Sequence, residues 1–211
     1  MTLKLNGSSS GSVALDAPTS TTSGADITFK LPVADGAAGQ VLTTNGSGQL
    51  EWKYPSIGFA DQWRITTTFA SADTNPISSN WERVDARGSS APLGTGMSES
   101  SGIFTFPQTG YWLVIFRAVA AGTHCDWINA EINVSLNASA GSPTYAHVAK
   151  GRDSCKDADS YSDVSAQAIV DVTSVSDVKV RFSVSAHNSL DWYGHTNQSE
   201  TSAIFLRLGD T

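Results

Sequence analysis

The stretch GIFTFPQTGYWLVIF, residues 102–116, decides the fold class of this chain. Two short runs rich in aromatic and β-branched residues lie on either side of a Pro-Gln-Thr-Gly segment, which is the composition of two strands joined by a turn. Alternation along the second run predicts two apolar faces, formed by Tyr111, Leu113 and Ile115 on one side and by Trp112, Val114 and Phe116 on the other. A strand of this kind must be covered on both sides.

One apolar face of residues 111–116 is expected to pack in the domain core, and the other needs a second cover. We interpret this second cover as a neighbouring subunit, and a loop of the same chain is the alternative. The candidates for a trimer interface are therefore Tyr111, Trp112, Leu113, Val114, Ile115 and Phe116.

Alternation with period two continues through most of the chain after Pro55. No segment carries a convincing helical period, and turn-forming residues separate the runs. The runs are 63–69, 80–84, 103–106, 111–120, 127–137, 144–150, 163–172, 177–186 and 201–208. Nine or so short strands of this kind predict an all-β sandwich or barrel.

The character of the sequence changes near Tyr54-Pro55, which predicts two parts: an arm of residues 1–55 and a domain of residues 56–211. In the arm, Asn-Gly turns separate short apolar runs, a strong hairpin signal. Isolated hairpins are marginal in water, so the arm needs partners, and copies around a threefold axis would supply them. The candidate anchoring residues are Leu3, Leu5, Ile27, Phe29, Leu31 and Trp52.

Composition excludes several classes of function for the 211 residues. The net charge of −7 argues against nucleic-acid binding, because phosphate recognition needs a basic face. No apolar run approaches the length of a membrane span, and the N-terminus has no apolar signal-peptide region, so we expect synthesis in a cytoplasm without Sec export. The GSSSG at 7–11 matches a hydrolase elbow only formally, and the four histidines have no adjacent triad partners, so we expect no enzyme and no cofactor.

Hairpin parity predicts where binding chemistry gathers. Strands joined by tight turns alternate in direction, so the connections 121–126, 151–162 and 187–200 share one end of the domain. Long loops on a rigid scaffold commonly carry binding residues. The contact candidates for a host glycan or protein are Leu190, Asp191, Trp192, Tyr193 and His195. The alternative for Trp192 is that it packs inward as a lid over the sandwich end.

The same parity places Cys125 and Cys155 at one end, where a disulfide is our hypothesis and two free thiols are the alternative. Four acidic residues near this end are weak candidates for calcium, and a solvated acidic loop is the commoner meaning of such a cluster. They are Asp153, Asp157, Asp159 and Asp163.

Two resemblances add to this account. The aromatic strand, Pro, Gly-Tyr turn and second aromatic strand of 102–116, with the terminal SAIFLRLGD, resemble C1q/TNF-like jelly rolls over residues 57–211. Members of that family are usually trimers whose aromatic strands line the threefold interface. The N-terminal segment, 1–53, contains LPVADGAAGQVLTTNGSGQLEW, which is similar to segments of tailed-bacteriophage fibre-type and decoration-type structural proteins.

Together the resemblances imply a homotrimeric virion surface protein, made in the host cytoplasm and released by lysis. The expected role is host attachment from a tail fibre, with the arm bound to a phage tail protein. The first alternative is a capsid decoration or cement protein (a head fibre) whose residues 1–55 bind the major capsid protein. The second is a C1q-like bacterial adhesin.

Overall fold

A computed structural model describes residues 3–6, 9–53, 55, 57–85, 88, 91–122, 124–156 and 160–211. The chain divides into two compact units, Met1–Ser56 and Ile57–Thr211, called here the arm and the head. No helix within these described ranges has the length and hydropathy that crossing a membrane requires.

The arm consists of two separate hairpins and an irregular connection. Strand β1 (Leu3–Asn6) pairs with β2 (Ser12–Leu15), and β3 (Val41–Thr44) pairs with β4 (Leu50–Lys53). A 3₁₀ turn, η1 (Thr22–Gly24), lies between the two hairpins.

The predicted Asn-Gly turn of the second hairpin is present. Gly46 and Gly48 have positive φ angles of 81° and 83°, which glycine adopts readily. The side-chain Oδ1 of Asn45 accepts a hydrogen bond from the amide of Ser47 at 2.8 Å. The alternating segment ADITFKLP, residues 25–32, does not form a strand, because the single bridge between Lys30 and Gln49 is its only ladder contact.

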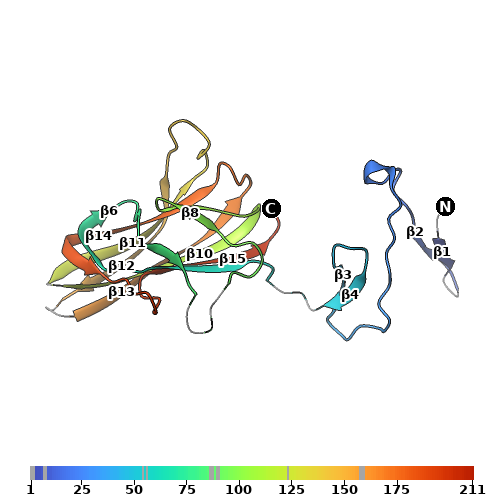
Figure 1. Ribbon diagram of the computed structural model, residues 1–211, viewed down its shortest axis with the longest axis horizontal. Helices are drawn as coiled ribbons and strands as arrows, with labels where there is room; N and C mark the ends of the chain where they lie inside the picture. Colours follow the sequence, from blue (N-terminus) through green and yellow to red (C-terminus); the bar gives the residue numbers. More distant parts are fainter. Residues whose placement is uncertain are drawn as a thin grey trace. The chain divides into compact units, whose positions relative to one another are not determined.

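The described residues of the head form eleven strands that are joined into one hydrogen-bonded sheet folded over itself (Figure 1). The strands are β5 (Ala60–Ile65), β6 (Phe69–Thr74), β7 (Trp81–Arg83), β8 (Ser98–Ser100), β9 (Ile103–Thr105), β10 (Gly110–Gly122), β11 (Cys125–Ser135), β12 (Ala146–Cys155), β13 (Ser160–Val172), β14 (Lys179–Trp192) and β15 (Ser202–Gly209).

Two layers form the sandwich. The first, called here the inner layer, has the order β13-β10-β15-β5-β7. The second, the outer layer, has β12-β11-β14, with β6 and β9-β8 paired along β14. A short β10–β14 pairing, Ala120 with Trp192, joins the layers at one end. The predicted all-β jelly-roll sandwich is therefore confirmed.

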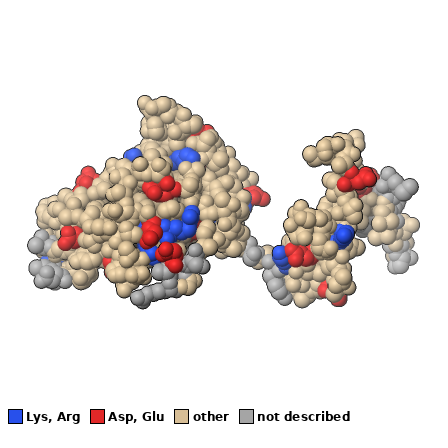
Figure 2. Space-filling view, viewed as in Figure 1, with Lys and Arg blue, Asp and Glu red and all other residues tan. Residues whose placement is uncertain are grey.

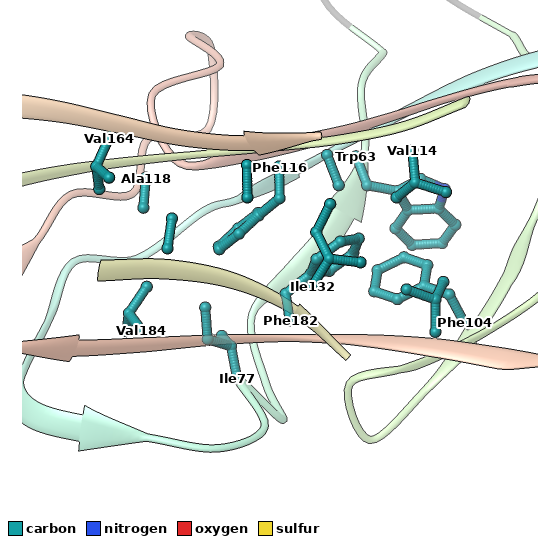
Figure 3. Packing of buried hydrophobic residues seen from close by; sticks show 14 of the residues in the cluster. Trp63, Ile77, Phe104, Val114, Phe116, Ala118, Ile132, Val164, Phe182 and Val184 are labelled. Atoms are coloured by element: carbon teal, nitrogen blue, oxygen red, sulfur yellow. The ribbon is translucent and has the colours of Figure 1, made fainter. Parts of the chain in front are cut away.

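The quoted stretch 102–116 supplies much of the core between the layers. Phe104, Phe106, Trp112, Val114 and Phe116 are all at most 1% exposed. The rings of Phe116 and Phe182 stack with centroids 4.7 Å apart, which joins the inner layer to the outer one. Figure 3 shows side chains from both layers pointing toward one another in this core.

The strand boundaries differ from prediction in two ways. The run 63–69 is two strands, because β5 ends at Ile65 and β6 begins at Phe69. At the end of the head where Gly122 pairs with Ser160 the strands are also longer than predicted, so each connection there is shorter than the predicted one.

This end, called here the far end, is opposite the end where the chain enters the head. The antiparallel pairing of Ala60 with Leu206 brings both termini of the head to the entry end (Figure 1). The pairings Gly122–Ser160 and Ala120–Trp192 place the ends of β10 and β14 and the start of β13 together at the far end. The parity argument for three connections at one end is therefore confirmed.

Candidate binding surfaces

The predicted contact loop at the far end is largely strand. Strand β14 extends to Trp192, and Leu190 and Trp192 are 2% and 0% exposed. The indole Nε1 of Trp192 donates a hydrogen bond to the carbonyl of Ser71 at 3.0 Å. The prediction that Leu190 and Trp192 contact a receptor is therefore wrong, because the ladder with β6 turns both side chains into the core.

The three other contact candidates lie at the surface of the far end. Asp191 is exposed, and Tyr193 and His195 are half-buried. Tyr193 packs against Tyr161 with ring centroids 5.2 Å apart, and their hydrogen bond raises the pKa of the Tyr193 hydroxyl. The Nδ1 atom of His195 accepts the amide hydrogen of Asn197 at 2.9 Å, which helps to shape the turn after β14. A receptor role for these three residues stays a prediction.

A small hollow of about 140 Å³ lies beside two of these residues, Asp191 and Tyr193, at the end of β10. Its lining is formed by Ala121, Gly122, Tyr161, Asp191 and Tyr193. The volume suits a few water molecules better than a ligand of drug size.

Cys125 and Cys155 are directly opposed in the β11–β12 ladder at the far end. Both are fully buried free thiols, and the Cys125 thiol donates to the carbonyl of Trp127 at 3.1 Å. Opposed residues on antiparallel strands have Cα atoms about 4.5–5.5 Å apart, within the range that a disulfide spans. The disulfide itself stays a hypothesis.

The weak calcium candidates are not gathered into a site where they are described. Asp163 accepts a hydrogen bond from Nε of Arg117 at 2.6 Å, and Asp153 is an exposed residue of β12. Asp157 and Asp159 lie outside the described residues. Over the described part of the chain, no group of three or more His, Cys, Asp or Glu side chains has a metal-binding arrangement.

The solvent-facing side of the inner layer carries an apolar stripe that no other part of the head covers fully. Tyr111 and Ile169 are 42% and 66% exposed. Four further apolar side chains on this face are half-buried: Leu113, Ile115, Ile204 and Leu206. Their registers place Leu113 beside both Leu206 and Ile169, so the stripe is continuous over three strands.

This stripe divides the six predicted interface residues into two sets. Trp112, Val114 and Phe116 belong to the core, so their assignment to an interface is wrong. The alternation in the sequence cannot decide which of two apolar faces points inward. Tyr111, Leu113 and Ile115 remain available on the outside.

The predicted anchoring residues of the arm are exposed. Leu3, Leu5, Ile27, Phe29 and Leu31 have between 58% and 71% of their surface open to solvent. Trp52 is less available at 37%, since its Nε1 donates to the carbonyl of Ala34 at 3.1 Å. Single exposed apolar residues are ordinary, but almost all the large apolar residues described in the arm are exposed, so these described residues form no core of their own.

Sequence reasoning missed a polar cluster on the outer layer. Alternation along the run 127–137 predicts one face of apolar residues such as Ile128 and Ile132 and an opposite, solvent face that contains Glu131 and Asn133. Glu131 and Asn133 are nevertheless 5% and 1% exposed. Glu131 Oε1 pairs with Lys150 Nζ at 2.6 Å, its Oε2 lies 3.2 Å from His147 Nδ1, and it accepts a hydrogen bond from Ser183 Oγ at 2.9 Å. Burial raises the pKa of Glu131, but the contacts with Lys150 and Ser183 outweigh it, so the net pKa lies below the usual range.

On the face of the head that Figure 2 shows, charges are intermixed rather than segregated. Figure 2 shows one face of the head, on which acidic and basic side chains lie next to one another and most of the remaining surface is uncharged. In the inner layer, Arg64 Nη2 lies 2.7 Å from both Glu82 and Asp85. A face of this kind does not provide the continuous basic surface that nucleic acid requires.

The geometry of the head is similar to that of solved structures, two of which are an Eiger TNF and an APRIL. The Eiger TNF of S. frugiperda aligns with a TM-score of 0.55 at 17% identity, over 73% of this chain and 95% of that one. Murine APRIL aligns with a TM-score of 0.51 at 12% identity, over 71% of this chain and 98% of that one. No protein-family model and no curated protein matches the sequence. At these identities the likeness concerns the fold: the head is a TNF-like jelly roll.

Proposed function

We propose that this chain is a non-catalytic, homotrimeric surface protein of a tailed-bacteriophage virion, in which the arm anchors the protein and the head projects outward. The observation that carries the proposal is the arm, whose large apolar side chains have no core to enter. Association with other chains would bury these side chains and release the corresponding free energy. The resemblance of residues 1–53 to phage structural segments supports the view that those other chains are proteins of a phage virion.

The trimeric state is supported by the stripe on the inner layer. Tyr111, Leu113, Ile115 and Ile169 form an apolar face on the side of the sheet that is turned away from the core. A second and third copy of the same chain would cover it by closed symmetry. The likeness to C1q/TNF-like jelly rolls, which are usually trimers, agrees with this arrangement.

Host attachment as part of a tail fibre is the role that we propose for the projecting head. In this role the far end of the head, with Asp191, Tyr193 and His195, would contact the host surface, since the chain enters the head at the opposite end. Capsid decoration is the second candidate, because the exposed apolar residues of the arm would serve equally to bind a capsid lattice.

Incorporation into particles tests the role of the arm. Infected cells supply either the full chain or residues 57–211, and gradient-purified particles are then analysed by quantitative immunoblotting. The full chain should co-sediment with particles, and the head alone should remain in the soluble fraction. Equal incorporation of both forms would contradict anchoring by the arm.

A further inference from the structure

A polar hollow of about 430 Å³ opens on the solvent-facing side of the outer layer, and neither the fold nor the proposed anchoring uses it. Strands β6, β11, β12 and β14 each contribute to its lining. The lining residues are Asp73, Trp127, Asn129, Lys150, Arg152 and Ser185. The volume lies within the range of pockets that hold small ligands.

Two breaks in strand pairing create this hollow. The β11–β12 register steps from Cys125–Cys155 to Ile128–Asp153, which leaves one extra residue in β11 and makes Asp126 and Trp127 both exposed. The β14–β6 register steps from Ser185–Asp73 to Leu190–Ser71, which leaves three extra residues in β14. Bulges of this kind re-aim side chains and are frequent next to functional sites.

The base of the hollow contains an incomplete hydrogen-bond arrangement. Asn129 is 4% exposed, and its Nδ2 donates to Ser185 Oγ at 3.0 Å. Its buried Oδ1 receives no hydrogen bond from any described residue. Buried polar atoms are nearly always paired, so an unpaired amide oxygen in the lining of a hollow points to a missing donor.

The rim supplies an aromatic ring and charges of both signs. Trp127 is 41% exposed, and its ring stacks beside His187 with centroids 6.4 Å apart. Arg152 and Asp73 are exposed, and neither side chain has an ion-pair partner among the described residues. Lys150, in contrast, is held by Glu131 at 2.6 Å.

We propose that this hollow binds a carboxylate-bearing saccharide. The only large apolar surface in the lining is the flat ring of Trp127, which suits the C–H face of a sugar ring. Asp73 and Asn129 accept hydrogen bonds from hydroxyl groups, and Ser185 both donates and accepts. The guanidinium of Arg152, which has no ion-pair partner in the part of the chain that the structure describes, matches a carboxylate, which it recognises with two parallel N–H donors.

The choice of a surface saccharide as the source of the ligand rests on the proposed attachment function. The site is distinct from the far-end candidates Asp191, Tyr193 and His195, since it lies on the solvent-facing side of the outer layer. If the head attaches to a host, the solvent-facing side of the outer layer takes part in the contact as well as the far end.

Titration of the purified full-length protein with defined sugars tests the inference. The probes are trigalacturonic acid and N-acetylneuraminic acid, with neutral cellotriose as the reference, and binding is followed by calorimetry and by saturation-transfer NMR. At least one acidic probe should bind more tightly than cellotriose. Arg152→Gln should weaken that binding about tenfold or more, the usual effect of losing a hydrogen bond to a charged group.

Two further variants make the test specific. Trp127→Ala should also weaken binding, and because 41% of this residue is already exposed the protein should keep its fold, which circular dichroism checks. Lys156→Gln removes the same charge at an exposed position outside the lining and should bind as the unmodified protein does. Failure of both acidic probes to bind, or equal binding by Arg152→Gln, would overturn the inference.

Binding by purified protein does not depend on where the protein is located in a particle. A saccharide that binds through Arg152 supports the site even if no particle carries the protein. Particles that carry the protein, combined with no binding of either acidic probe, overturn this site alone and leave the proposed virion function in place.

Discussion

At the residue scale, the buried side chains of the head divide into apolar ones that hold the layers together and a few polar ones that depend on specific partners. Trp192 belongs to the first group: it is fully buried at the far end and its indole nitrogen is hydrogen-bonded to Ser71. Glu131 belongs to the second, since Lys150, His147 and Ser183 surround its carboxylate.

Replacing Trp192 with alanine should destabilise the head rather than remove a contact with a receptor. The loss of a fully buried tryptophan costs about 3–5 kcal/mol in free energy of unfolding, measured by denaturant titration. Trp127→Ala is the matched control, because that side chain is 41% exposed, and it should cost far less. Equal losses for the two variants would show that Trp192 is not part of the core.

Glu131→Gln should make the head less stable at neutral pH, and this difference should vanish in acid. The folded-state pKa of Glu131 is lowered, so its stabilising contribution is present above the unfolded pKa of about 4.3 and is lost as the pH falls through the folded pKa. Thermal unfolding at a series of pH values measures the difference. Asp153→Asn, at an exposed position of β12, is the control, and a gap between Glu131→Gln and the unmodified protein that persists in acid would contradict the account.

At the element scale, β10 determines how the head is organised. Its inward face supplies Trp112, Val114 and Phe116 to the core, and its outward face supplies Tyr111, Leu113 and Ile115 to the apolar stripe. One strand therefore contributes both to the fold of the single chain and to the proposed contact between chains.

Leu113→Asp should convert the protein from trimer to monomer. A carboxylate at the centre of the stripe would be buried without a partner in the proposed interface, which is strongly unfavourable. Sedimentation equilibrium measures the mass. Val175→Asp changes an exposed apolar residue in the turn between β13 and β14 and should leave the trimer intact. A monomeric unmodified protein, or a trimeric Leu113→Asp variant, would contradict the assignment of the stripe.

The opposed cysteines of β11 and β12 should form a disulfide when oxidised. Incubation with oxidised glutathione converts the two thiols to one disulfide and releases two molecules of reduced glutathione. Thiol counting in non-reducing denaturant should then find no free thiol, and the Cys155→Ser variant should retain the thiol of Cys125 or carry it as a mixed disulfide with glutathione. Two thiols remaining free after prolonged oxidation would end the hypothesis.

Sequence patterns predicted the positions of the strands better than the contacts that each strand makes with strands distant in the sequence. Alternation and turn residues located most strands of the head and the Asn45-Gly46 hairpin of the arm. They did not show that β14 extends to Trp192, because a polar run such as His187–Asp191 is typical of a loop until its partner β6 is known. They also did not reveal the hollow beside Trp127, since bulges depend on register between strands that are distant in the sequence.

At the scale of the whole molecule, the two units differ in how far they bury their apolar residues. The head encloses a core between its layers, whereas the arm leaves Leu3, Leu5, Ile27, Phe29 and Leu31 exposed. An arm without a core and a head with one apolar face open are both explained if the protein works only in an assembly. The proposed surface position on a virion would supply that assembly, with self-association through the head and anchoring through the arm.

The location of the protein tests this account most directly. Antibodies raised against residues 57–211, coupled to gold, are applied to intact phage particles from a culture that expresses the chain, and the grids are viewed by electron microscopy. The account predicts label on the particles, confined to the tail if the head attaches to the host and spread over the capsid if it decorates. Unlabelled particles, with the label instead on bacterial surfaces, would contradict it and favour an adhesin.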